Sequence, residues 1–124
     1  MLDSFHLYAS GGAIEEISKL GSEQVVAVLV NDATEGVALE ELSDEDRHLP
    51  GATGVINAVG FVKELEKIGY DGPVTPEPSS RQARQMSREQ AARKAGEAIE
   101  QLWQDGGLVP LEPEPEEATA STEA

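Results

Sequence analysis

Three short apolar runs in this sequence are each followed by side chains that can move protons or bind cations. Asp3 and His6 follow the apolar start of the chain and lead toward Gly11–Gly12, which predicts a glycine-rich loop around them. Asp32 ends a run of valines, and Glu77 follows a third apolar segment. Carboxylates and imidazoles serve as general acids and bases, and they also bind divalent cations. If the three runs are neighbouring strands, these side chains share one site.

The segments that must position these residues alternate between strand and helix patterns. The predicted order is a strand at 1–2, a helix at 13–21, a strand at 25–30, a polar loop at 33–54, a helix at 57–69, a strand at 73–77 and a helix at 88–104. Strands that alternate with helices predict right-handed βαβ units and a parallel sheet. The polar residues after each strand would then meet at the carboxyl edge of that sheet, where α/β barrels carry their reactive groups.

The ends of the predicted helices have recognisable signals. Asn57 is placed to cap the middle helix, which Gly69 would end. Ser87 and Gln90 have the spacing of a capping box at the start of the last helix. Trp103 falls on the apolar face of that helix, which predicts packing in the core.

Composition limits the classes of function. The 124 residues carry a net charge of −15, and only nine are Lys or Arg, which argues against a nucleic-acid partner. No cysteine is present, so neither a disulfide nor a thiolate metal site can form. The N-terminal residues lack the pattern of a secretory signal, and no apolar run is long enough to cross a membrane. These features predict a cytoplasmic protein.

The last fourteen residues differ from the rest of the chain. They contain five glutamates and no basic residue, a composition typical of a solvated, disordered tail. The sequence therefore predicts an α/β domain over residues 1–110 and a disordered acidic tail over 111–124.

Several of these segments, taken in order, resemble one known family. "LDSFH", "NDA" after the valine-rich strand, "RHLPGATGVINAVGFVKELEKIGYDGPVTPEP" and the last helix are similar to the C-terminal part of sugar phosphate isomerase/epimerase proteins. These belong to the xylose-isomerase-like TIM barrel superfamily. The resemblance implies a partial (β/α)8 barrel, in which the three strands correspond to the sixth, seventh and eighth.

The resemblance also implies a reaction and a site. Family members transfer a proton beside a sugar carbonyl through an enediolate, with a divalent metal (Mn²⁺ or Mg²⁺ is expected) stabilising the charge on oxygen. By position, Asp3 resembles a metal ligand, and Glu77 resembles the glutamate that binds metal and transfers the proton. His6 and Arg47 resemble residues that contact the oxygens of a sugar or sugar phosphate substrate.

Two departures from the family pattern bear on activity. Leu29 stands where many members have a metal-binding histidine, and the second catalytic glutamate belongs to an earlier strand that this sequence does not contain. About five barrel units have no counterpart here. We therefore expect a fragment that is inactive alone, and a chain that self-associates or binds a partner supplying the missing units.

Two other functions remain open at this point. A non-catalytic binding or scaffold module would explain Leu29 and the missing glutamate. A DNA repair enzyme similar to endonuclease IV belongs to the same superfamily, but the acidic composition and the two histidines disfavour it. The sequence specifies neither the substrate, the metal nor the oligomeric state.

Overall fold

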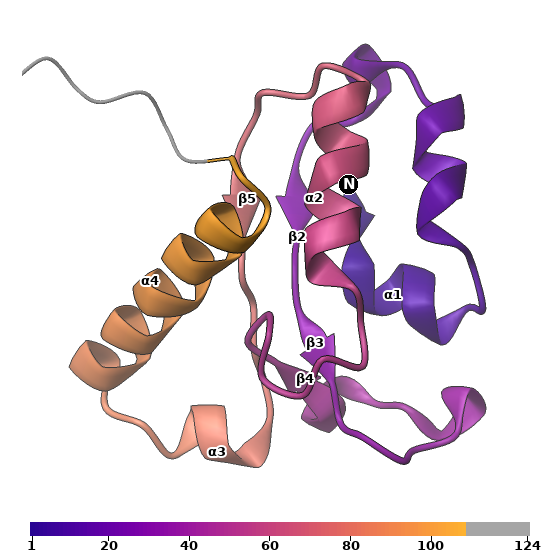
Figure 1. The fold of residues 1–124 in the computed structure, drawn as a ribbon. Helices are drawn as coiled ribbons and strands as arrows, with labels where there is room; N and C mark the ends of the chain where they lie inside the picture. Colours follow the sequence, from indigo (N-terminus) through magenta and orange to yellow (C-terminus); the bar gives the residue numbers. More distant parts are fainter. Residues whose placement is uncertain (109–124) are drawn as a thin grey trace, which may run out of the picture.

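A parallel sheet of three short strands forms the centre of the molecule in this computed structural model, which describes residues 1–108 (Figure 1). The strands are β1 (Leu2–Asp3), β2 (Val28–Leu29) and β5 (Val74–Thr75), and β2 lies between the other two. Leu2 pairs with Val28, and Val28 pairs with Val74, both in parallel register. The predicted parallel arrangement is confirmed. The predicted acidic tail at 111–124 lies outside the described residues.

The valine run at 25–30 forms a shorter strand than predicted. Val28 and Val30 are fully buried, whereas Val26 is 78% exposed and Leu29 is half-buried. Within residues 1–108, one face of this run is therefore buried and the other is not. One face packs against helix, and the other, which carries Leu29, faces the hollow described below.

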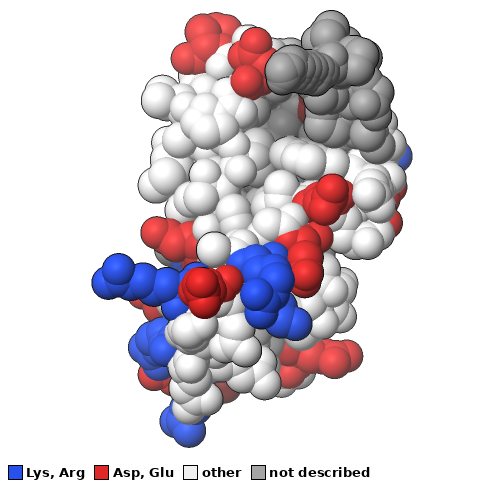
Figure 2. Space-filling view, turned by 90° about the vertical axis from the view of Figure 1, so that its left-hand side faces the viewer, with Lys and Arg blue, Asp and Glu red and all other residues white. Residues whose placement is uncertain are grey.

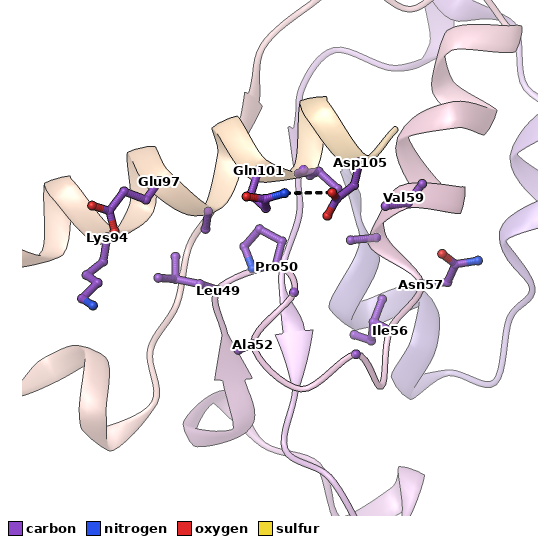
Figure 3. A pocket seen from close by; sticks show the side chains of 15 residues that line it. Leu49, Pro50, Ala52, Ile56, Asn57, Val59, Lys94, Glu97, Gln101 and Asp105 are labelled. Atoms are coloured by element: carbon purple, nitrogen blue, oxygen red, sulfur yellow. Dashed lines mark hydrogen bonds between the residues drawn. The ribbon is translucent and has the colours of Figure 1, made fainter. Parts of the chain in front are cut away.

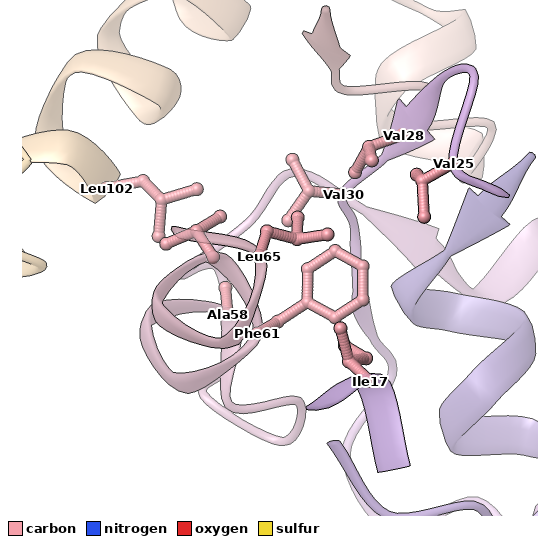
Figure 4. Close-up of a cluster of buried hydrophobic side chains, with 9 residues drawn as sticks. Ile17, Val25, Val28, Val30, Ala58, Phe61, Leu65 and Leu102 are labelled. Atoms are coloured by element: carbon pink, nitrogen blue, oxygen red, sulfur yellow. The ribbon is translucent and has the colours of Figure 1, made fainter. Parts of the chain in front are cut away.

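Helix α2 (Ala58–Lys67) covers the buried face of the sheet. Asn57 caps it, as predicted, by accepting a hydrogen bond from the Gly60 amide at 2.9 Å. Its inward side chains, above all Phe61, pack against Val28 and Val30 (Figure 4). Gly69 follows the helix with a φ of +82°, a conformation that costs glycine little.

The predicted helix at 13–21 is a 3-10 helix, η1 (Ile14–Lys19), followed by a second short turn, η2 (Ser22–Gln24). The spacing explains the difference, because Ile14, Ile17 and Leu20 lie three residues apart and a 3-10 helix has three residues per turn. Ile17 is buried against α2.

Helix α1 (Ser4–Ala9) replaces the predicted loop around His6. It forms because the Asp3 side chain caps its first turn, accepting a hydrogen bond from the Phe5 amide at 2.8 Å. The glycine pair at 11–12 only ends this helical segment. The prediction of a loop at His6 was therefore wrong, although Asp3 does end a strand.

The predicted polar loop at 33–54 contains more structure than expected. Strands β3 (Asp32–Ala33) and β4 (Arg47–His48) form an antiparallel ribbon outside the main sheet, with 3-10 turns η3 (Leu39–Glu41) and η4 (Asp44–Asp46) between them. Because β4 runs back along β3, Arg47 lies near the end of β1.

Two helices are the last elements within residues 1–108. α3 (Arg81–Arg84) lies in a stretch predicted as loop, and α4 (Arg88–Asp105) begins at the predicted capping box of Ser87 and Gln90. Trp103 packs against the core cluster, as predicted. No helix in residues 1–108 is long and apolar enough to cross a membrane.

Candidate functional site

A hollow of about 630 Å³ lies at the carboxyl ends of the parallel strands. The four residues that the family resemblance indicates line it, together with Leu29: these are Asp3, His6, Arg47 and Glu77. Asp32, which the sequence placed in the same site, is fully buried and does not line this hollow. They come from β1, α1, β4 and the segment after β5. The ends of three strands and the returning ribbon therefore converge on one place.

Asp3 and Arg47 form a buried ion pair in the wall of this hollow. Arg47 Nη2 donates to Asp3 Oδ2 at 2.7 Å, and both residues are less than a tenth exposed. The other Asp3 oxygen holds the start of α1. Arg47 Nε also donates to Asp44 at 3.2 Å, and the guanidinium lies 4.7 Å from the centre of the Phe5 ring.

These contacts keep Arg47 charged. Burial alone lowers the pKa of an arginine, but the hydrogen bond and charge of Asp3, with a smaller contribution from Asp44, outweigh burial and raise the pKa of Arg47 above its ordinary value. The site thus contains a permanent cation in a fixed position.

His6 lies at the solvent side of the ion pair. Its Nε2 is 2.9 Å from Arg47 Nη2 and 3.7 Å from Asp3 Oδ2, and its side chain is 70% exposed. Because a guanidinium can only donate, Nε2 is the acceptor in this contact. His6 and Arg47 therefore present neighbouring polar groups to whatever enters the hollow.

Glu77 is held by its backbone while its side chain stays exposed. Its amide donates to the Asn31 side-chain oxygen at 2.8 Å, and its carboxylate accepts no hydrogen bond from residues 1–108. Such a carboxylate is free to accept a proton or a cation.

Asn31 and Asp32 hold neighbouring segments in place, as their position after the valine run suggested. Both are fully buried directly after β2. Asp32 accepts hydrogen bonds from four backbone amides: those of Ala33 at 2.8 Å, Thr53 at 2.8 Å, Gly54 at 2.7 Å and Ile56 at 2.9 Å. The only sequence signal was a polar pair at the end of a buried valine run.

The donor set of residues 1–108 does not by itself fit a divalent metal. No group of three or more His, Cys, Asp or Glu side chains gathers in this part of the chain. Both Asp3 oxygens are hydrogen-bonded, one of them to a cationic guanidinium, and Leu29 offers no donor atom. Catalytic metal sites commonly use three protein ligands.

A second hollow, of about 590 Å³, contains none of these four residues. It lies between α4 and the segment at 49–59, and its wall includes Leu49, Pro50 and Ile56 (Figure 3). Gln101 and Asp105 at its margin bond to each other at 2.8 Å. Lys94 and Glu97 also line this hollow, whose wall is otherwise mainly apolar.

Basic and acidic side chains are mixed on the face that carries α3 and the start of α4 (Figure 2). Five of the nine Lys and Arg residues fall within 81–94. Arg84 in this group lies 3.4 Å from Glu45. The face in Figure 2 has no continuous basic area of the kind that neutralises nucleic-acid phosphates.

The fold and the site define a class. Parallel strands, a helix covering one face, and polar residues at the carboxyl ends are the features of a segment of a parallel α/β barrel. The sequence model of the xylose isomerase-like TIM barrel family matches residues 1–102, and the chain belongs to this family. The resemblance predicted from the sequence is confirmed, as is the fold class.

Two similar proteins are named inosose isomerases. An inosose isomerase of Halalkalibacterium halodurans is 35% identical over 95 residues, which cover 77% of this chain and 33% of that protein. An inosose isomerase of Bacillus licheniformis is 31% identical over 97 residues, covering 78% and 34%. The chain spans about a third of the length of the curated relatives it matches.

Solved structures show the same partial match. The IOLI protein with a bound zinc atom superposes with a TM-score of 0.76 at 27% identity, covering 84% of this chain and 37% of that one. A xylose isomerase domain protein from Alicyclobacillus acidocaldarius gives 0.71 at 32% identity, covering 87% and 37%. The described fold therefore corresponds to part of a TIM barrel.

Proposed function

We propose that this chain forms one side of a sugar isomerase or epimerase site, which acts on a sugar or sugar phosphate by proton transfer beside a carbonyl. The observation that carries the proposal is the convergence of Asp3, His6, Arg47 and Glu77 on one hollow at the carboxyl ends of parallel strands. The names of the inosose isomerase relatives support the same class of reaction.

In this proposal each residue has a distinct task. Glu77, exposed and without a hydrogen bond to its carboxylate from residues 1–108, takes the proton from carbon. Arg47 and His6 bind substrate oxygens, and the fixed guanidinium stabilises the negative charge that develops on oxygen. Asp3 holds Arg47 in place through the buried ion pair.

A metal enters the proposal only with help from outside this part of the chain. A divalent ion, Mn²⁺ or Mg²⁺, would polarise the carbonyl when bound. Asp3 and Glu77 are the groups this chain offers to it, and further donors would come from a partner chain or a second copy. The same partner would cover the open edges of β1 and β5, each of which has one strand neighbour within residues 1–108.

A non-catalytic binding module is the second candidate. Leu29 in the wall of the hollow and the Asp3–Arg47 pair favour it, because both reduce the capacity for metal chemistry. The hollow would then recognise a sugar without converting it.

The first test separates binding from catalysis. Titration of the chain with an inosose, followed by NMR, is expected to shift the signals of the hollow, and His6→Gln is expected to weaken binding. For turnover, this chain replaces the matching third of the H. halodurans relative, and exchange of the substrate proton with D₂O is measured. In that chimera Glu77→Gln is expected to slow exchange by about 10²-fold or more.

The control is Glu97→Gln, an exposed glutamate on α4 away from the strand-end hollow. It is expected to leave both binding and exchange unchanged. Full exchange activity in Glu77→Gln would exclude the catalytic proposal. Sugar binding in a chimera that shows no exchange would favour the binding module.

A further inference from the structure

The segment that carries Glu77 has one backbone hydrogen-bond donor. Glu77 stands between Pro76 and Pro78, and proline has no amide hydrogen. The last ladder bond before this point runs from the Val30 amide to the Thr75 carbonyl at 3.0 Å. The position of Glu77 therefore depends heavily on where its own N–H bonds.

That donor goes to a side chain rather than to the backbone of β2. The Glu77 amide donates to Asn31 Oδ1 at 2.8 Å. Because an N–H requires an acceptor, this contact also fixes which end of the Asn31 amide faces Glu77. The asparagine oxygen thus extends the pairing of β2 with β5 past the end of the regular ladder.

Asn31 is itself held rigidly from the opposite side. The backbone N–H of Asn31 donates to Ser4 Oγ at 2.8 Å, and Ser4 Oγ donates to the backbone carbonyl of Asn31 at 2.9 Å. Ser4 directly follows Asp3, and both Ser4 and Asn31 are essentially inaccessible to solvent. Asn31 therefore links the ends of all three parallel strands.

We propose that Asn31 is the positioning residue for Glu77, setting where its carboxylate stands in the hollow. This inference rests on the role given to Glu77 in the proposed function. Downstream, the Arg47 carbonyl accepts hydrogen bonds from the Ser79 and Ser80 amides at 3.2 and 3.0 Å. Glu77 is consequently fixed from both sides, between Asn31 and the backbone of Arg47.

The unpaired nitrogen of the Asn31 side chain supports a role for the side-chain oxygen. Asn31 Nδ2 is buried and has no hydrogen-bond partner within residues 1–108. A buried N–H without a partner destabilises a protein, and leucine, which has the same branching and no donor, would avoid that cost. What asparagine adds here is an acceptor for Glu77.

The experiment uses the whole chain and measures hydrogen exchange of the Glu77 amide by NMR. Asn31→Leu removes the acceptor and is expected to speed exchange at Glu77 by about tenfold or more, because that amide loses its only bond. Asn31→Asp keeps an oxygen in the same place and is expected to retain most of the protection. Should Asn31→Leu not fold, Asn31→Gln applies the same test by moving the oxygen one methylene away.

Ser4→Ala is the matched control, since it removes the bonds on the other side of Asn31 and leaves the Glu77 contact. It is expected to lower stability without selectively exposing the Glu77 amide. Unchanged Glu77 exchange in Asn31→Leu, or an equal increase in Ser4→Ala, would overturn the inference. This readout needs no turnover, so its failure is separate from failure of the proposed function.

In the chimera described above, a second readout tests the link to chemistry. Asn31→Leu is expected to lower kcat for proton exchange by about tenfold while KM stays near that of the parent, and Asn31→Asp is expected to restore part of the loss. A rise in KM alone, with kcat unchanged, would assign Asn31 to binding instead and overturn its role in placing Glu77.

Discussion

Asp32 shows how one residue can hold the ribbon that carries Arg47. Burial by itself would raise the pKa of its carboxyl, but the amides of Ile56, Thr53, Gly54 and Ala33 together outweigh burial and lower the pKa below its ordinary value of 3.8. A pKa that is lower in the folded state means that the carboxylate adds stability above about pH 4. That contribution is lost as the pH falls through the lowered pKa.

Asp32→Asn is therefore expected to destabilise the chain at neutral pH. An amide can accept some of the four bonds but turns an N–H toward others, so the free energy of unfolding should fall by about 1–3 kcal/mol at pH 7. Urea unfolding at a series of pH values measures this. The difference from the parent should shrink below about pH 4, as the parent carboxylate takes up a proton.

Glu35→Gln is the control for this measurement, since Glu35 is an exposed acid in the same ribbon segment. It should change stability little at any pH. A difference between parent and Asp32→Asn that persists unchanged in acid would contradict the assigned role.

Sequence reasoning at the residue scale found the side chains that face the hollow but not the contacts that position them. Asp3, His6 and Glu77 were identified from their types and their places after apolar runs, and Arg47 from the family resemblance. Asn31 bonds to a backbone amide 46 residues away. Such side-chain-to-backbone contacts have no periodicity in sequence, so only coordinates can reveal them.

At the element scale, stability depends on the packing of α2 between the sheet and η1. Phe61 is completely buried among Ile17, Val28 and Val30 (Figure 4). Phe61→Ala is expected to reduce the free energy of unfolding by about 3–5 kcal/mol, because it removes buried surface and leaves a cavity. Thermal or urea unfolding followed by circular dichroism measures the loss.

Val26→Ala provides the comparison, because Val26 is 78% exposed although it belongs to the same valine run as Val28. Its effect should stay within about 0.5 kcal/mol, as for other surface substitutions. Equal losses at Phe61 and Val26 would show that the cluster around α2 is not the core.

Elements with strong local signals were predictable and the others were not. α2 and α4 have capping residues and several turns of apolar spacing, and both begin where the sequence predicted. β3 and β4 pair only two residues each, which is too short for an alternating pattern. α1 depends on the cap from Asp3, and its six residues are too few for an apolar spacing that would reveal a helix.

At the scale of the whole molecule, the barrel resemblance accounts for the parallel order β1–β2–β5, and the remaining question is what the site can bind. The hollow gathers two carboxylates and one exposed histidine, but Asp3 is already paired with Arg47 and Leu29 contributes no ligand. The parallel order could be predicted because alternating strand and helix patterns permit few topologies. The Asp3–Arg47 pair could not, since it depends on the return of an irregular ribbon.

Metal titration tests this view of the site directly. Calorimetric titration of the chain with Mn²⁺ or Zn²⁺ is expected to show no tight one-to-one binding, because the described residues supply too few free donors. Leu29→His adds an imidazole to the wall of the hollow and should strengthen Zn²⁺ binding relative to the parent. Asp3→Asn in the same background should reverse that gain if Asp3 becomes a ligand. Tight binding by the parent that Asp3→Asn abolishes would instead show that Arg47 gives up the Asp3 carboxylate to a metal.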